Sequence, residues 1–110
     1  MAKRNTTSPD EARSVVTAAL TATGATGSSA FFLGGINVAV WGTFAGTVQI
    51  ERSFDGGSTW LVLDQDLTGT DLTFTAPKSL IVEEVESAVL YRANCTAFTS
   101  GTINVRISQG

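Results

Sequence analysis

Short stretches in which apolar and polar residues alternate constrain the fold of this chain more than any other feature. Residues 36–41 place Ile36, Val38 and Val40 on one side, and three later stretches alternate in the same way: 47–51, 71–75 and 102–107. A period of two is that of a strand with one buried face. Five further candidate strands are 15–23, 30–33, 59–63, 80–85 and 89–94. The start of the first also fits a helical turn after Ser14.

Glycine-rich breaks separate these stretches and predict turns. They are Gly34-Gly35, Gly42 to Gly46, Asp55-Gly56-Gly57 and Ser100-Gly101. Short strands at a spacing of roughly 8–12 residues are typical of two packed antiparallel sheets. We therefore predict an all-β fold, a single jelly-roll-like β-sandwich of about eight antiparallel strands. Its expected core is Ile36, Val38, Val40, Val48, Ile50, Trp60, Leu72, Phe74, Val89, Tyr91, Ile103 and Val105.

The beginning of the chain differs from the remainder. It is polar and contains Pro9, so we predict an N-terminal arm over residues 1–14 and a β-sandwich domain over 15–110. Ordering each residue costs about 1–2 kcal/mol of backbone entropy. The arm is therefore either a frayed terminus or a segment that leans on another chain, with Lys3, Arg4 and Arg13 paired to carboxylates there.

Composition argues against most enzyme classes. The 110 residues include no histidine and one cysteine, Cys95, and the net charge is −3. Histidine is the commonest general base and metal ligand, and no histidine is present to activate Cys95 as a nucleophile. The acidic balance disfavours nucleic acid as a partner, and no apolar run is long enough to span a membrane. We expect a non-enzymatic protein without cofactor, metal, nucleic-acid or membrane partner.

Charged residues outside the arm form three groups. The acidic ones are Asp64, Asp66 and Asp71 in one loop and Glu83, Glu84 and Glu86 in another segment. Either group could supply oxygen ligands for calcium, but the EF-hand spacing is absent and we interpret both as solvated charge. Arg52, Arg92 and Arg106 lie in different candidate strands. They are either plain surface charge or outward side chains that bridge to Glu51 or to a partner.

Residues 53–60 form the most specific local motif. Their sequence, SFDGGSTW, matches the pattern S-x-D-x-G-x-T-W and resembles the Asp-box hairpin of sialidases and related propellers. In such a hairpin the aspartate accepts hydrogen bonds from amides of its own turn, glycine supplies positive φ, and the aromatic residue enters the core. The resemblance implies a structural hairpin made by Ser53, Asp55, Gly57, Thr59 and Trp60. It implies no sialidase activity, because the motif occurs once and the chain is too short for a propeller.

Large apolar residues exceed what one small core can absorb. Phe31-Phe32-Leu33 are consecutive, so they cannot all face one side of a strand. Trp41, Phe44 and Phe98 lie near predicted hairpin tips. We expect a subunit interface near Phe31, Phe32, Trp41, Phe44 and Phe98. The alternative is a second small core beneath a loop.

A longer resemblance covers roughly residues 36–109. Residues 36–57, the pair Tyr91-Arg92 and the terminal stretch 100–109 are similar to small β-sandwich virion proteins of tailed bacteriophages. That group includes head decoration proteins, fibre-base domains and collar or tail accessory proteins.

The resemblance implies a structural virion protein, most specifically a capsid decoration (cement) subunit that is made in the host bacterial cytoplasm. Its implied partners are the major capsid protein or other virion proteins, and further copies of itself, with a trimer as the expected homo-oligomer. The alternative class is a carbohydrate- or receptor-binding module of a tail or fibre, or a neck or tail accessory protein.

Overall fold

The computed structural model describes residues 14–65 and 70–109. Within these ranges every regular element is a strand, which confirms the all-β class. The nine strands are β1 (Val15–Leu20), β2 (Ala30–Trp41), β3 (Phe44–Ser53), β4 (Leu61–Val62), β5 (Asp64–Gln65), β6 (Thr70–Asp71), β7 (Thr73–Phe74), β8 (Lys78–Gly101) and β9 (Ile103–Gln109). No helix of this part of the chain could cross a membrane.

Hydrogen bonding joins seven of the strands into one antiparallel sheet. Its order is β1-β9-β2-β8-β3-β4, with β7 also paired to β3, while β5 and β6 form a separate pair. The prediction of two separate packed sheets is not confirmed, because hydrogen bonds join the main strands into one continuous sheet. Residues 15–20 are a strand paired with β9 and not a helical turn.

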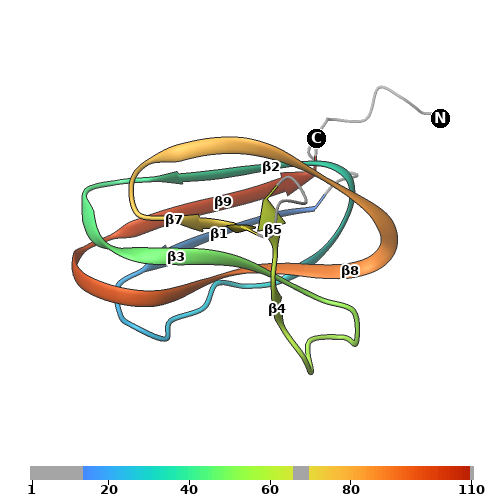
Figure 1. The fold of residues 1–110 in the computed structure, drawn as a ribbon, viewed down its shortest axis with the longest axis horizontal. Coiled ribbons are helices and arrows are strands. Elements are labelled where there is room, and N and C mark those ends of the chain that lie inside the picture. The colour runs from blue at the N-terminus through green and yellow to red at the C-terminus, as the bar shows by residue number, and fades with distance from the viewer. Residues whose placement is uncertain (1–13, 66–69, 110) are drawn as a thin grey trace.

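The long strand β8 makes the sheet fold back on itself. Residues 78–84 pair with the second part of β2, whereas residues 90–101 pair with β3. Figure 1 shows β8 turning at one end of the molecule, so that β1, β9 and β2 lie on one side and β3 on the other. The apolar faces of these two layers meet in a single core.

The core contains the predicted residues with one exception. Eleven of the twelve are buried, joined by Leu20, Phe32, Ala93, Cys95 and Ile107 among others. The exception is Trp60, which is half-buried outside the core cluster. The alternation rule succeeds because β2, β3, β8 and β9 each turn one face to this core.

The predicted turn at Gly34-Gly35 is wrong. Both glycines lie inside β2, which continues through them from Ala30 to Trp41. Gly34 has positive φ and stands where the β2–β8 register shifts. A pair of glycines can mark a bulge as well as a turn, and here it bends a strand. In the same way, the two predicted strands 80–85 and 89–94 are parts of one strand, β8.

Candidate interaction surface

The hairpin between β3 and β4 is held by hydrogen bonds to Asp55 and Ser53. Asp55 Oδ1 accepts from the Thr59 amide and from the Ser53 hydroxyl, both at 2.8 Å. Ser53 Oγ in turn accepts from the Gly57 amide at 2.9 Å, and Gly56 and Gly57 have positive φ. These bonds, led by that from the Thr59 amide, lower the pKa of Asp55 to about 2. The hairpin has the contacts that the Asp-box motif predicts.

Trp60 departs from the motif because it packs on the outside of the sheet. The Arg92 guanidinium lies 4.2 Å from the centre of its ring, a cation–π contact. Arg92 Nε also donates to Glu51 Oε1 at 2.8 Å. Glu51 Oε2 accepts from Asn94 at 2.9 Å and from Gln49 at 2.6 Å. The tryptophan thus covers a polar network on the outer face of β3 and β8 instead of entering the core.

A second network lies beneath the turn of β8, around Glu84. This carboxylate is buried, and its Oε1 accepts from Arg52 Nη1 at 2.6 Å and from the Tyr91 hydroxyl at 2.8 Å. Its Oε2 accepts from the Glu86 amide at 3.1 Å. Arg52 also lies 4.9 Å from the centre of the Phe54 ring. The interpretation of Glu84 as solvated charge is therefore wrong, since it is a buried anchor between three segments.

Both buried carboxylates are held in the charged form. Burial raises the pKa of Glu84, but the hydrogen bonds from Tyr91, the Glu86 amide and Arg52 outweigh it, and the net pKa is lowered. For Glu51, burial is outweighed in the same way by Asn94, Gln49 and Arg92. Burial, then the bond to Glu84, raises the pKa of Tyr91 well above its usual range. Such a set of hydrogen-bonded, charged carboxylates around a neutral tyrosine suits a rigid scaffold better than proton transfer.

Above this network the chain of β8 forms a wide bulge. Phe32 pairs with Val89 and Gly34 with Glu84, so the single residue Leu33 faces the four residues 85–88. Ala88 closes the bulge with a φ of 65°, a conformation that costs a residue with a side chain roughly 1–2 kcal/mol. Strain of this kind is commonly retained at functional positions.

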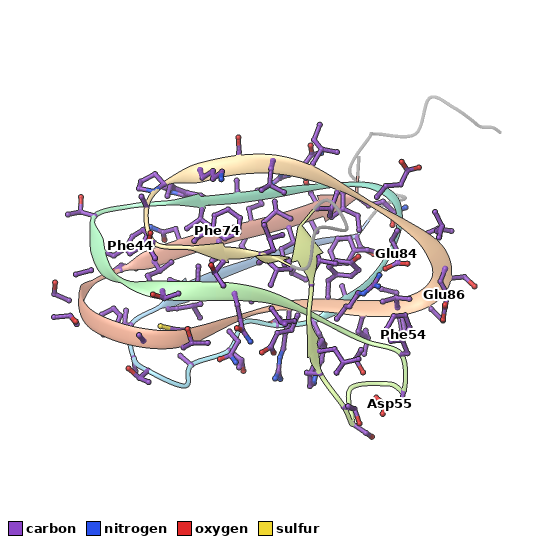
Figure 2. All side chains as sticks on the ribbon, in the orientation of Figure 1. Phe44, Phe54, Asp55, Phe74, Glu84 and Glu86 are labelled. Atoms are coloured by element: carbon purple, nitrogen blue, oxygen red, sulfur yellow. The ribbon has the colours of Figure 1, made fainter. Side chains whose placement is uncertain are left out.

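Exposed apolar side chains gather around this bulge. Val85 at its tip is 87% exposed, and Phe31, Leu33 and Phe54 are each about half exposed. Leu33 lies opposite the bulge in the β2–β8 register, and Phe54 contacts Arg52, which is bound to Glu84. Figure 2 shows Phe54, Glu84 and Glu86 together at this end of the molecule. We call the surface formed by Phe31, Leu33, Phe54 and Val85 the bulge end.

The other predicted interface residues are distributed differently. Phe32 is fully buried and packs edge-on against Tyr91 at 5.7 Å between ring centres, so its prediction as an interface residue is wrong. Phe44 and Phe98 are partly buried against the core. Trp41 is exposed at the opposite end of β2 from Phe31. Lys3, Arg4 and Arg13 lie outside the described residues.

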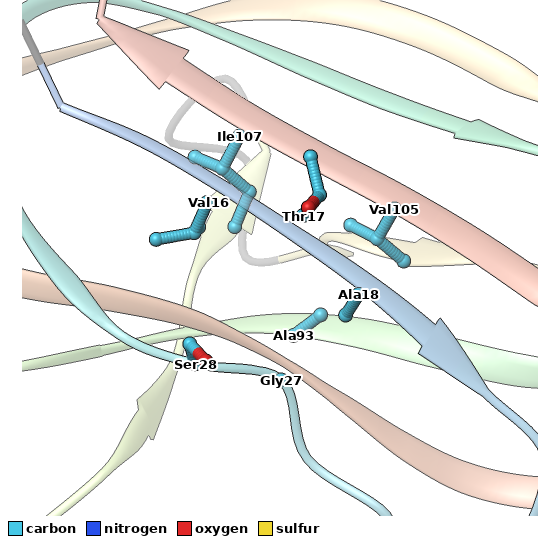
Figure 3. Close-up of a pocket in the computed structure, with 8 residues that line it drawn as sticks. All are labelled: Val16, Thr17, Ala18, Gly27, Ser28, Ala93, Val105 and Ile107. Atoms are coloured by element: carbon cyan, nitrogen blue, oxygen red, sulfur yellow. The ribbon is translucent and has the colours of Figure 1, made fainter.

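No metal cluster is found where the structure describes the chain. No group of three or more histidine, cysteine, aspartate or glutamate residues gathers there. Asp66 lies outside the described residues. A narrow crevice between β1 and residues 27–28, lined mainly by Val16, Ala18, Ala93 and Val105, is too small to admit water. Figure 3 shows its apolar lining, and a methyl group added at Gly27 would stand only 2.8 Å from the Ala18 side chain.

Sequence reasoning did not identify Val85 or the bulge. Residues 80–89, LIVEEVESAV, neither alternate regularly nor contain the glycine or proline that would mark a bulge.

Comparisons of the chain with protein-family models, with curated proteins and with solved structures give no significant match. The function is therefore argued from the geometry of the chain and from the resemblance described above.

Proposed function

We propose that this chain is a non-enzymatic structural protein of a bacteriophage particle, most specifically a capsid decoration subunit, and that it binds the capsid through the bulge end. The single observation that carries the choice of surface is the gathering of Val85, Phe31, Leu33 and Phe54, all exposed, around one strained bulge. Exposed apolar groups that cluster in this way mark interaction sites.

Rigid support under the bulge favours a binding role. Glu84 is tied to Arg52, to Tyr91 and to the Glu86 amide, so both the base and the start of the bulge are fixed from beneath. A surface that is ordered before binding loses less entropy on association. The cost of burying a carboxylate and of the positive φ at Ala88 is consistent with a surface retained for binding.

The charge around the bulge end indicates the chemistry of the partner. Asp55 and Glu86 are exposed there, and Arg52, the cation that contacts Phe54, is already paired with Glu84. Two copies that met through this end would bring their carboxylates together, which is unfavourable. The fitting partner is a different protein surface, apolar at its centre and bordered by lysine or arginine.

The test is cosedimentation with capsids assembled from the major capsid protein of the same genome. We expect the full chain to pellet with these capsids, and Val85→Lys to bind at least about tenfold more weakly. Ala97→Lys is the matched control, because Ala97 is also exposed on β8 but lies far along the strand from the bulge. It should bind as the unmodified chain does.

Two results would contradict the proposal in different ways. Failure of the unmodified chain to bind capsids at micromolar concentration would overturn the decoration role. Equal binding of Val85→Lys and Ala97→Lys would leave the role intact and overturn the assignment of the bulge end.

The alternative, a carbohydrate-binding module, requires an aromatic ring with a free face. Arg92 already covers one face of Trp60, whereas Trp41 is about half exposed. Binding to a glycan array that is lost in Trp41→Ala, without binding to capsids, would favour this alternative.

A further inference from the structure

The outer face of the layer formed by β1, β9, β2 and the first part of β8 is a second surface, which adjoins the bulge end along β2 and β8. Alternate residues of these strands belong to the core, so the residues between them point outward. The registers align the outward residues in rows across the four strands. One row is Val15, Ser108, Asn37 and Ile81, and the next is Thr17, Arg106, Ala39 and Ser79.

This face is poor in charge and mixes apolar side chains with uncharged polar ones, among which Ser108 is buried. Ile81 is 74% exposed, Trp41 and Val15 are also exposed, and the neighbouring outward residues are mostly small, as at Ala19 and Ala39. The opposite outer face, by contrast, is covered by the polar network around Glu51. In a chain with a net charge of −3, a sheet face with so little charge is suited to contact with another sheet face of the same kind.

The two charged residues on the face are complementary to each other. Arg106 on β9 pairs with Ala39 of β2, and Glu83 on β8 pairs with Gly35 of β2. Ala39 and Gly35 are each two residues from Asn37, so Arg106 and Glu83 lie at similar distances from Asn37 on opposite sides of it. Two copies can stack face to face about a two-fold axis that lies in the plane between them and passes near Asn37. In this arrangement Arg106 of each copy meets Glu83 of the other.

We propose that this face binds a second copy of the same chain, so that two copies stack sheet against sheet with Ile81 and Trp41 in the contact and Arg106 paired to Glu83 across it. The inference does not depend on the proposed function. A face that meets its own copy closes at two subunits, so this contact makes a dimer, not the trimer expected from the resemblance.

The size of the face sets the expected affinity. Four strands spaced about 4.8 Å apart and rows covering about 20 Å give a flat area of about 400 Å² for each copy. Protruding side chains increase the accessible area, but the contact stays near the low end for specific interfaces, about 1,200 Å² in total. We therefore expect a dimer that dissociates at micromolar concentration.

Sedimentation velocity of the full chain over a range from about 5 to 500 μM tests the proposal. We expect a monomer–dimer equilibrium in the unmodified protein. Arg106→Glu and Glu83→Arg should each weaken dimerisation at least about tenfold, because each places like charges together. The double variant exchanges the charges, and it should restore dimerisation to within about threefold.

Ile81→Ser should also weaken the dimer, because it removes exposed apolar surface without changing the charge. This variant keeps the test valid if a charge variant does not fold. Ala97→Lys, on the part of β8 that pairs with β3, is the control that should dimerise normally. A protein that stays monomeric throughout this range would overturn the proposal. The proposal would also be overturned if the single charge variants and Ile81→Ser dimerised as strongly as the unmodified chain.

Discussion

Replacing Glu84 with glutamine tests the network that supports the bulge. Glu84 accepts hydrogen bonds from Arg52 and Tyr91 on one oxygen and from the Glu86 amide on the other. Glutamine keeps the shape but loses the charge, and its amide nitrogen cannot accept a hydrogen bond. Hydrogen bonds to a charged group contribute about 1.5–3 kcal/mol each, and neutral ones about 1 kcal/mol.

The expected loss follows from these contacts. The Arg52 bond is discounted because its side chain is 31% exposed, and glutamine retains at least one acceptor position. We expect Glu84→Gln to lower the free energy of unfolding by about 3 kcal/mol. For a domain of this size that corresponds to about 10 °C in the melting temperature. The measurement is thermal unfolding followed by circular dichroism at pH 7.

Glu83→Gln is the matched control, since Glu83 is the preceding residue on β8 and is exposed. It should change the free energy of unfolding by less than about 0.5 kcal/mol at concentrations where the chain is monomeric. The pKa of Glu84 is lower in the folded state than its unfolded value of 4.5. The contribution of Glu84 to the free energy of unfolding is therefore complete above pH 4.5 and is lost as the pH falls through the folded pKa. Glu84→Gln and the unmodified chain should therefore converge in stability as the pH falls from 4.5 through the lowered folded pKa of Glu84. A variant that melts with the unmodified chain at pH 7 would refute the supporting role of Glu84.

Three further predictions concern other parts of the chain. Asp55→Ala should lower the melting temperature, because it leaves the Thr59 amide without its acceptor, and an unchanged melting curve would contradict the hairpin geometry. Gly101→Ala should cost at least about 3 kcal/mol, since a Cβ there would overlap the Thr43 carbonyl at positive φ. Gly24→Ala has similar φ but open space, so guanidinium unfolding should show a loss of only about 1–2 kcal/mol. Deleting residues 2–13 should leave the far-ultraviolet spectrum and melting curve unchanged, and loss of the fold would place those residues in the domain.

Local signals in the sequence predicted the parts of the fold that depend on local chemistry. The alternation around Val38, Val48 and Val105 identified strands and their buried faces because a strand has a fixed period of two. The bonds of Asp55 were predictable because they close within four residues. Neither inference required knowledge of which strands are neighbours.

Features that depend on distant neighbours could not be predicted in this way. Trp60 lies outside the core because Arg92, 32 residues later on β8, offers a guanidinium for its ring. Phe32 is buried, whereas Phe31 is exposed, because the register with Val89 turns alternate residues inward. Glu84 is buried because Tyr91 and Arg52 are brought to it by the turn of β8 and by β3.

The same turn of β8 links the fold to both proposed contacts. A strand that bends from one layer into the other leaves extra residues at the bend, and in this chain they are residues 85–88, the bulge that carries Val85 of the bulge end. The straight part before the bend carries Ile81 and Glu83 on the outer sheet face. As proposed, the two surfaces differ in chemistry. The bulge end carries the exposed carboxylates of Asp55 and Glu86 and selects a different partner, whereas the sheet face carries one charge of each sign and fits its own copy.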